Sequence, residues 1–251
     1  MSTAPTSSTA GAPPRTIICI PTYNEREVLP SIVDAVRSAV PYATVMVVDD
    51  NSPDGTGGLA DEIAARDKQV RVLHRKGKEG LGAAYRHAFR VALDDGFERI
   101  VQMDADFSHA PSDVPRLLAA LEAGADFAVG SRYTAGGGTE NWGIGRQIIS
   151  KGGGLYARTA LGIGVKDLTA GFKAWKASTL RGINLDGVDA KGYGFQIEMT
   201  YRALRNGFKV QEVPIKFVDR RVGQSKMSGS IFVEALTLVW RLRFSIPKGR
   251  G

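Results

Sequence analysis

The chain has 251 residues, of which 43% are hydrophobic, and its formal net charge is +7. A chain of this length and composition can bury a substantial core, and we expect it to form one domain. The positive charge suits nucleic acid, anionic lipid or phosphorylated substrates. However, basic residues are dispersed among acids and no zinc, helix-turn-helix or RNA-sheet motif is present, which argues against a nucleic-acid partner.

The first fifteen residues are small and polar, and they contain no apolar run that could serve as the hydrophobic region of a signal peptide. We predict that residues 1–15 form a disordered tail. The single cysteine, Cys19, has no partner with which to form a disulfide, which fits a reducing compartment.

From residue 16, short β-rich runs alternate with stretches that have apolar residues at three- and four-residue spacing. The predicted strands are Thr16–Ile20, Thr44–Val48, Val70–His74, Arg99–Met103 and Asp126–Gly130. The predicted helices are Ser31–Val40, Leu59–Arg66, Gly82–Asp94 and Ser112–Glu122. This order predicts an α/β fold, with a mostly parallel sheet flanked by helices.

Three of the predicted strands end in polar segments, at residues 21–25, 49–55 and 104–106. The carboxyl ends of parallel strands form the edge of a sheet at which ligands bind, so these segments are expected to share one rim. Asp104 and Asp106 repel each other on a short turn, and a divalent cation that also binds phosphate oxygens would offset that repulsion. The alternative is that these acids only cap the following helix.

The other two polar segments suit a nucleotide. Carboxylates at residues 49–50 can accept hydrogen bonds from a nucleobase edge or from ribose hydroxyls. Tyr23 can stack on a base, and Glu25 can accept from donor groups. A plain turn rich in Asp and Asn is the alternative for residues 49–55.

The second half of the chain begins with a glycine-rich loop at residues 135–142. A helix-like stretch follows from Arg146, then a predicted helix at Gln196–Arg205 and a predicted strand at Lys209–Val218. The apolar segment at residues 231–240 is too short to span a bilayer, which needs ~20 residues. With Trp240, Phe244 and the basic chain end it suits a bilayer interface, and a core or dimer-forming helix is the alternative.

Short segments along most of the chain carry a family resemblance. In the first half they are 21–25 (PTYNE), 48–56 (VDDNSPDGT), 81–85 (LGAAY), 103–109 (MDADFSH) and 130–133 (GSRY). In the second half they are 167–172 (DLTAGF), 192–198 (GYGFQIE), 212–214 (EVP) and 217–226 (FVDRRVGQSK). Together they resemble family 2 glycosyltransferases of the GT-A fold, more narrowly the dolichol-phosphate mannose synthases and the bacterial polyprenol monophosphomannose synthases.

The resemblance implies a GT-A, Rossmann-like nucleotide-sugar transferase domain at residues 16–227, followed by an amphipathic, basic segment at residues 228–251. It also implies roles for individual positions. The residues implied to bind guanosine are Pro21, Tyr23, Glu25, Val48 and Asp50. The residues implied to bind the metal and the diphosphate are Asp104, Ala105 and Asp106, with Asp106 and Asp104 as the metal ligands. Further implied phosphate contacts are Arg132, Arg220 and Lys226 for the donor and Arg146 and Ser150 for the acceptor.

The implied reaction transfers mannose from GDP-mannose to polyprenyl or dolichyl phosphate with Mg²⁺ or Mn²⁺, and it inverts the anomeric configuration. Asp104, Asp106 and Arg132 are the implied catalytic residues. The acceptor phosphate is already anionic at neutral pH, so no strong general base is needed. Ser108 stands where some family members have a metal-coordinating glutamine, which leaves room for a water.

The resemblance also implies a peripheral protein on the cytoplasmic face of a membrane, and the sequence leaves open whether a membrane-spanning subunit is a partner. A glucosyltransferase that uses UDP-glucose stays as an alternative, because carboxylates alone do not select the base. A dinucleotide-binding dehydrogenase is a further alternative, since residues 80–84 partly match a glycine-rich fingerprint, although they follow the third strand.

Overall fold

The computed structural model describes residues 13–190, 192–218 and 229–246. Seven strands form the main sheet in the order β3-β2-β1-β4-β7-β5-β8, and β6 pairs with β9 in a second sheet. The strands are β1 (Thr16–Thr22), β2 (Thr44–Asp49), β3 (Val70–His74), β4 (Arg99–Gln102), β5 (Phe127–Ser131), β6 (Gly138–Glu140), β7 (Lys173–Lys176), β8 (Val210–Pro214) and β9 (Lys216–Val218). The helices are α1 (Leu29–Ala39), α2 (Thr56–Arg66), α3 (Leu81–Asp94), α4 (Val114–Glu122), α5 (Ile144–Leu161), α6 (Ala177–Gly182), α7 (Tyr193–Arg205) and α8 (Gly229–Ser245), with 3₁₀ turns at η1 (Pro111–Asp113) and η2 (Leu185–Gly187).

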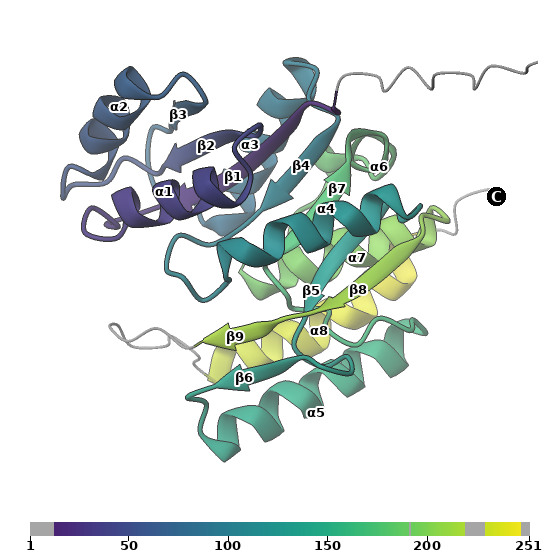
Figure 1. Cartoon of the computed structure of the whole chain (residues 1–251). Helices are drawn as coiled ribbons and strands as arrows, with labels where there is room; N and C mark the ends of the chain where they lie inside the picture. The colour runs from purple at the N-terminus through teal and green to yellow at the C-terminus, as the bar shows by residue number, and fades with distance from the viewer. Residues whose placement is uncertain (1–12, 191, 219–228, 247–251) are drawn as a thin grey trace, which may run out of the picture.

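The main sheet is mostly parallel. Strands β3, β2, β1 and β4 pair in parallel, β7 runs antiparallel between β4 and β5, and β8 is again parallel to β5. Six of the seven strands therefore point the same way, and Figure 1 shows their arrowheads turned toward one side of the molecule. The predicted fold class, a mostly parallel sheet flanked by helices, is confirmed.

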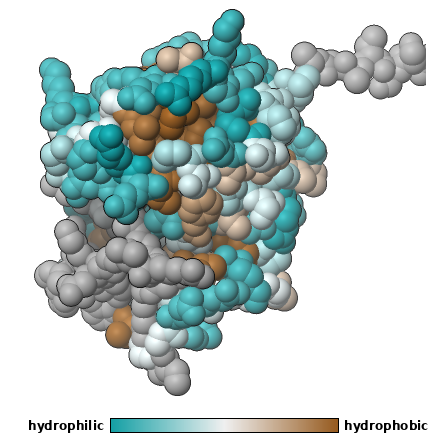
Figure 2. Space-filling model, turned by 60° about the vertical axis from the view of Figure 1, so that its left-hand side comes forward, coloured by the Kyte–Doolittle hydropathy of each residue, from teal (hydrophilic) through white to brown (hydrophobic). Residues whose placement is uncertain are grey.

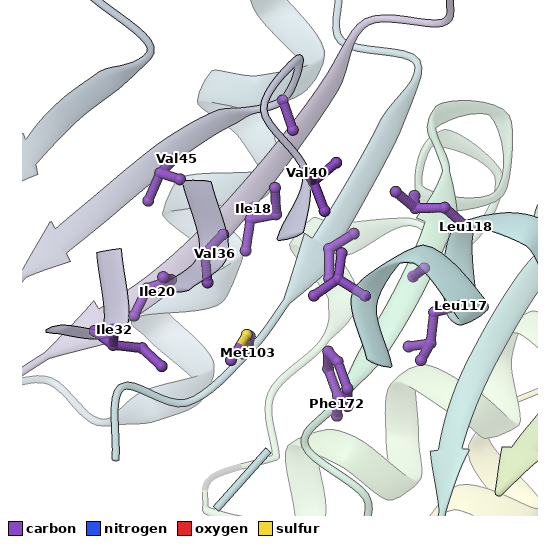
Figure 3. Packing of buried hydrophobic residues seen from close by; sticks show 14 of the residues in the cluster. Ile18, Ile20, Ile32, Val36, Val40, Val45, Met103, Leu117, Leu118 and Phe172 are labelled. Carbon is purple, nitrogen blue, oxygen red and sulfur yellow. The ribbon is translucent and has the colours of Figure 1, made fainter. Parts of the chain in front are cut away.

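Helices cover both faces of the sheet because successive side chains of a buried strand point to opposite faces. Ile18 and Ile20 of β1 pack with α1 and α4, as the close view in Figure 3 shows. Ile17 and Cys19 of the same strand pack on the other face with α3, α6 and α7. This two-sided burial explains why the strands are continuously apolar in the sequence.

The chain's last described helix, α8, packs against α5 and α7 in a third hydrophobic cluster. Leu238, Val239 and Leu242 of α8 are buried in it, together with Ala157 and Leu161 of α5. Figure 1 shows α5 and α8 side by side along the lower edge of the molecule. Within the described ranges, no helix is both long and apolar enough to cross a membrane.

Three features of the second half differ from the sequence-based prediction. The predicted strand at 209–218 divides at Pro214–Ile215 into β8 and β9, which belong to different sheets. The glycine-rich loop contains the short strand β6. Strand β7, which was not predicted, has only four residues and includes two lysines, but it is buried between β4 and β5.

Candidate active site

The ends of β1, β2, β3 and β4 are held together by backbone hydrogen bonds beyond the strands. The amide of Asp50 donates to the carbonyl of Thr22 (3.1 Å), and the amide of Arg75 donates to the carbonyl of Asp49 (2.9 Å). The amide of Met103 donates to the carbonyl of Cys19 (3.2 Å). The polar segments after these strands consequently share one rim, as predicted. Figure 2 shows the side toward which the strands run, where hydrophilic residues surround patches of hydrophobic ones.

The segments after β1 and β2 interlock. The amide of Asn24 donates to Ser52 Oγ (3.1 Å), and the amide of Glu25 donates to Thr56 Oγ1 (3.0 Å). Asn24 and Asn51 both have left-handed backbones, with φ of 60° and 58°, a conformation that asparagine tolerates better than most residues. These contacts fix the two loops relative to each other and define the position of Glu25.

Asp50 is buried in an ion pair with Arg75. The guanidinium of Arg75 also bonds Glu79 Oε2 at 2.9 Å, and the side chains of Asp50 and Arg75 are only 8% and 5% exposed. Burial raises the pKa of Asp50, whereas the hydrogen bond and the charge of Arg75 lower it. Sequence reasoning missed Arg75, although it follows β3 just as the predicted residues follow their own strands.

Aromatic and apolar residues complete this part of the rim. Tyr23 is exposed, and the ammonium of Lys78 lies 3.8 Å from its ring centroid. Pro21 is half-buried at the end of β1, and Val48 is fully buried in β2. The arrangement combines an exposed ring with nearby carboxylates, which suits a planar base.

The acidic turn lies directly after β4. Asp106 Oδ1 accepts a hydrogen bond from the amide of Ser108 (3.0 Å), and Phe107 between them has φ of 59°. Asp104 is 31% exposed, and its Oδ1 lies 3.5 Å from the hydroxyl of Tyr85 beneath it. Ala105 between the two acids is buried. The turn is thus fixed by its own backbone, with both acids only partly buried.

His109 is a packing residue beside this turn. Its ring is buried, stacks on Phe172 at a centroid distance of 5.0 Å and meets Phe217 edge-on at 5.5 Å. The amide of Asp104 donates to His109 Nδ1 (3.4 Å). Burial lowers the pKa of His109, which favours the neutral ring.

The acidic turn fits a divalent cation that also binds substrate. Asp104 and Asp106 provide hard carboxylate oxygens, the ligand type that Mg²⁺ and Mn²⁺ take. In the part of the chain that the structure describes, no group of three or more His, Cys, Asp or Glu residues could hold a metal by itself. Phosphate and water oxygens would have to complete the shell, as is usual for Mg²⁺.

Arg132 follows β5 and forms a bidentate ion pair. Its Nε and Nη2 donate to the two oxygens of Asp167 at 2.7 and 2.6 Å, and Nη2 also donates to Thr169 Oγ1 at 2.8 Å. Asp167 is fully buried, and Trp142 and Phe217 each lie with a ring centroid 5.4 Å from the guanidinium. The structure therefore shows an internal ion pair for Arg132, a residue that the family resemblance marked as a phosphate ligand and as catalytic.

The predicted acceptor residues belong to α5. Arg146 lies in the first turn of this helix, and the hydroxyl of Ser150 lies 2.6 Å from that of Tyr133. The structure thus brings Ser150 next to the segment that holds Arg132. Arg220 and Lys226 lie outside the described residues, so their predicted roles stay predictions.

Comparison with known proteins gives several related sequences. The family model described as glycosyl transferase family 2 matches residues 17–182. A polyprenol monophosphomannose synthase from Mycolicibacterium smegmatis is 52% identical over 240 residues, which cover 94% of this chain and 91% of that protein. An undecaprenyl-phosphate mannosyltransferase from Micrococcus luteus is 52% identical over 227 residues, 90% and 93% of the two chains.

More distant proteins share the fold. A dolichol-phosphate mannosyltransferase from Pyrococcus furiosus is 38% identical over 90% of this chain, which corresponds to 62% of the longer protein. A glucosyl-3-phosphoglycerate synthase from Mycobacterium tuberculosis, solved with Mn²⁺, UDP and phosphoglyceric acid, gives a TM-score of 0.66 at 20% identity and covers 93% of this chain and 80% of that one. A mannosyltransferase from Pyrobaculum calidifontis, solved with GDP-Man and Mn²⁺, gives a TM-score of 0.53 at 15% identity over 94% and 71% of the two chains.

These matches agree with the mostly parallel sheet flanked by helices. The chain belongs to glycosyl transferase family 2, has the GT-A fold, and is a glycosyltransferase.

Proposed function

We propose that this glycosyltransferase transfers mannose from GDP-mannose to a polyprenyl or dolichyl phosphate and inverts the anomeric configuration. The observation that carries the proposal is the 52% identity, over 94% of the chain, to a polyprenol monophosphomannose synthase. The shared rim of the β1, β2 and β4 ends supports it, because a nucleotide and a diphosphate-binding turn need to lie side by side.

The donor half of the proposed site consists of the segments after β1, β2 and β4. Tyr23 is exposed and would stack on the base, and Asp50 and Glu25 would accept hydrogen bonds from the nucleoside. Asp104 and Asp106 would hold Mg²⁺ or Mn²⁺ beside the diphosphate. When bound, the cation neutralises the negative charge that grows on the leaving GDP.

The acceptor half of the proposed site lies between the end of β5 and α5. The nucleophile is an oxygen of the lipid phosphate, which is already anionic, so positioning and charge take the place of a general base. His109 is buried and stacked on Phe172, which supports a role in holding the acidic turn and not in proton transfer. Arg132, anchored by Asp167, and Arg146 are the proposed cations near the meeting point of the two anions.

The test is mannosyl transfer from GDP-mannose to polyprenyl phosphate, with and without chelator, for the native protein and Asp106→Asn. We expect chelator or the substitution to lower kcat at least about a hundredfold, the scale of losing one main electrostatic contact. Asp94→Asn, an exposed residue at the end of α3, is the matched control and keeps full activity. Transfer that is indifferent to both treatments would contradict the metal assignment.

A parallel arm of this assay replaces GDP-mannose with UDP-glucose. We expect transfer with the guanosine sugar only, and exclusive use of UDP-glucose would establish the alternative donor.

We also propose that the protein binds the cytoplasmic face of a membrane peripherally through α5 and α8. Each helix carries large exposed hydrophobic residues although the pair is packed together: Leu155 is 60% exposed and Phe244 is 79% exposed. Trp240 is 46% exposed, and its indole donates to the hydroxyl of Tyr156 (2.8 Å), which ties the two helices. Exposed apolar side chains beside basic ones suit an anionic bilayer interface.

A further inference from the structure

The hydroxyl groups of Tyr133 and Ser150 lie 2.6 Å apart, a short distance for two neutral oxygens. Tyr133 follows β5, whereas Ser150 lies in α5, seventeen residues later. This pair is therefore a direct bond between the strand end that holds Arg132 and the helix that carries the predicted acceptor residues.

The position of the Tyr133 hydroxyl is fixed from its own side. The guanidinium of Arg132 lies 5.2 Å from the centroid of the Tyr133 ring, and Arg132 itself is held by both oxygens of Asp167. The amide of Tyr133 donates to Ser131 Oγ (3.3 Å), and Ser131 Oγ in turn donates to Glu212 (2.7 Å). Because this half-buried tyrosine is already restrained and has only two side-chain torsions, its hydroxyl loses little further conformational entropy when it binds a ligand.

Two hydroxyls that bond each other have one donor proton left over. Each group has one O–H donor, and the bond between them uses one of the two protons. The remaining O–H can donate to an external acceptor, and it is polarised by the first bond. An anionic phosphate oxygen is the acceptor for which such a donor is strongest.

We propose that Tyr133 is a positioning residue of the acceptor-phosphate site, and that the Tyr133–Ser150 pair, and not Ser150 alone, forms its uncharged donor. The ligand is the phosphate monoester of the prenyl acceptor. The inference rests on the proposed function, in which the acceptor half of the site lies between the end of β5 and α5, the helix that carries Ser150. No covalent step is added, because both hydroxyls only bind and orient.

The experiment measures steady-state KM for both substrates, with a short, water-soluble prenyl phosphate as acceptor, for Tyr133→Phe, Ser150→Ala and the double variant. Phenylalanine keeps the ring beside Arg132 and removes only the hydroxyl. We expect each single variant to raise the acceptor KM about tenfold, as for loss of one hydrogen bond to a charged group, and to leave the KM for GDP-mannose unchanged. The acceptor KM of the double variant should be at most about twice that of either single variant, because both substitutions break the same hydroxyl pair.

Tyr42→Phe is the matched control, since Tyr42 is an exposed tyrosine between α1 and β2, and it should leave both KM values unchanged. Thermal melting of each variant shows whether it is folded, and if Tyr133→Phe melts early, Ser150→Ala still tests the pair from α5. Calorimetric titration of the short prenyl phosphate in the absence of donor should show the same loss of affinity.

Three results would overturn the inference: an acceptor KM within twofold of native for Tyr133→Phe, an equal rise in both KM values, or single effects that multiply in the double variant. Failure of the proposed function is distinguishable, because the native protein would then transfer no mannose to the prenyl phosphate at all.

Discussion

Arg75 favours the ionised form of Asp50. The Asp50 carboxyl is buried, and burial alone favours its neutral form. The hydrogen bond and the charge of Arg75 lower the pKa and so partly offset that effect. A carboxylate accepts two hydrogen bonds from the paired N–H donors of a guanine edge, which a protonated acid does not do.

The substitution Arg75→Gln should therefore weaken GDP-mannose binding in a pH-dependent way. Without Arg75 the pKa of Asp50 rises further. As the pH is lowered, Asp50 therefore becomes protonated at a higher pH in the variant than in the native protein. We expect the ratio of the variant's KM for GDP-mannose to the native KM to increase as the pH falls, to about tenfold. Arg37→Gln breaks a more exposed ion pair, between Arg37 in the last turn of α1 and Asp67 after α2, and should leave this KM unchanged. A pH-independent KM for Arg75→Gln would contradict this role.

The proposed metal site at the acidic turn has a testable binding property. Asp104 and Asp106 would fill only part of a coordination shell, so Mn²⁺ alone should bind weakly and Mn²⁺ with GDP at least about tenfold more tightly. Electron paramagnetic resonance of free Mn²⁺, titrated with protein in the presence and absence of GDP, measures both affinities. Asp106→Asn should abolish the effect of GDP. Equal Mn²⁺ affinity with and without GDP would show that the diphosphate is not a ligand.

At the scale of elements, the sequence predicts the first half of the fold well because its strands are buried on both faces. Runs such as Thr16–Ile20 and Thr44–Val48 agree with β1 and β2 to within two residues. Helix α2 begins at Thr56, three residues before the predicted Leu59, because Gly57 and Gly58 give no apolar period there. The strand-end rule also placed the acidic turn and the nucleotide segments at one rim.

The second half was harder to predict because its elements are short and depend on distant partners. Lys173 in β7 is fully buried, with its ammonium nitrogen bonded to Gln196 of α7, a contact that no local pattern indicates. Arg75 and Tyr133 contact Asp50 and Ser150, which lie 25 and 17 residues away in the chain, so a local sequence pattern does not indicate these contacts either. The family resemblance implied roles for individual residues, but it did not indicate which other residues they contact.

Gly137, in the loop before β6, packs closely against the backbone at the end of β5. A Cβ added to Gly137 would lie 2.5 Å from the carbonyl oxygen of Ser131 and 3.0 Å from the backbone of Arg132. Gly137→Ala should therefore push β6 away from the end of β5, with a loss of ~1–3 kcal/mol in unfolding free energy and a lower kcat. Gly143→Ala, for which the new methyl group has open space, should be neutral in denaturant titrations and in turnover. Native stability of Gly137→Ala would show that the loop adjusts freely.

At the scale of the whole molecule, α5 and α8 place the proposed acceptor site next to the surface that we propose binds lipid. Helix α5 carries Ser150 near its beginning and the exposed Leu155 one turn later. Helix α8 packs on α5 through buried residues of the third hydrophobic cluster. Deleting α8 would expose that cluster, and a loss of membrane binding could then come from unfolding as well as from lost docking. Point substitutions on exposed positions are the cleaner test.

The double variant Leu155→Ser and Phe244→Ser should bind anionic vesicles at least about tenfold more weakly, since burying each side chain contributes roughly 1.5–3 kcal/mol. Its activity should fall with a long-chain polyprenyl phosphate in vesicles and stay native with a short, soluble prenyl phosphate, because only the first acceptor has to be reached at a membrane. Sedimentation with vesicles and parallel assays measure the two effects. Tyr42→Ser, which removes an exposed aromatic residue far along the chain from α5 and α8, is the control.

Equal loss on both acceptors would mean that the substitutions damage the site and not the docking. Vesicles that contain only lipid also test the need for a membrane-spanning subunit. If the native protein binds these vesicles, direct docking through α5 and α8 is supported. If it binds only after membrane protein has been added, the exposed residues contact a protein partner instead. The distinction follows from the chemistry of the surface, because a bilayer tolerates any apolar side chain at Leu155 and Phe244 whereas a protein interface requires a particular shape. Leu155→Phe and Phe244→Leu, which exchange the two side-chain types, should therefore keep native vesicle binding if lipid is the partner.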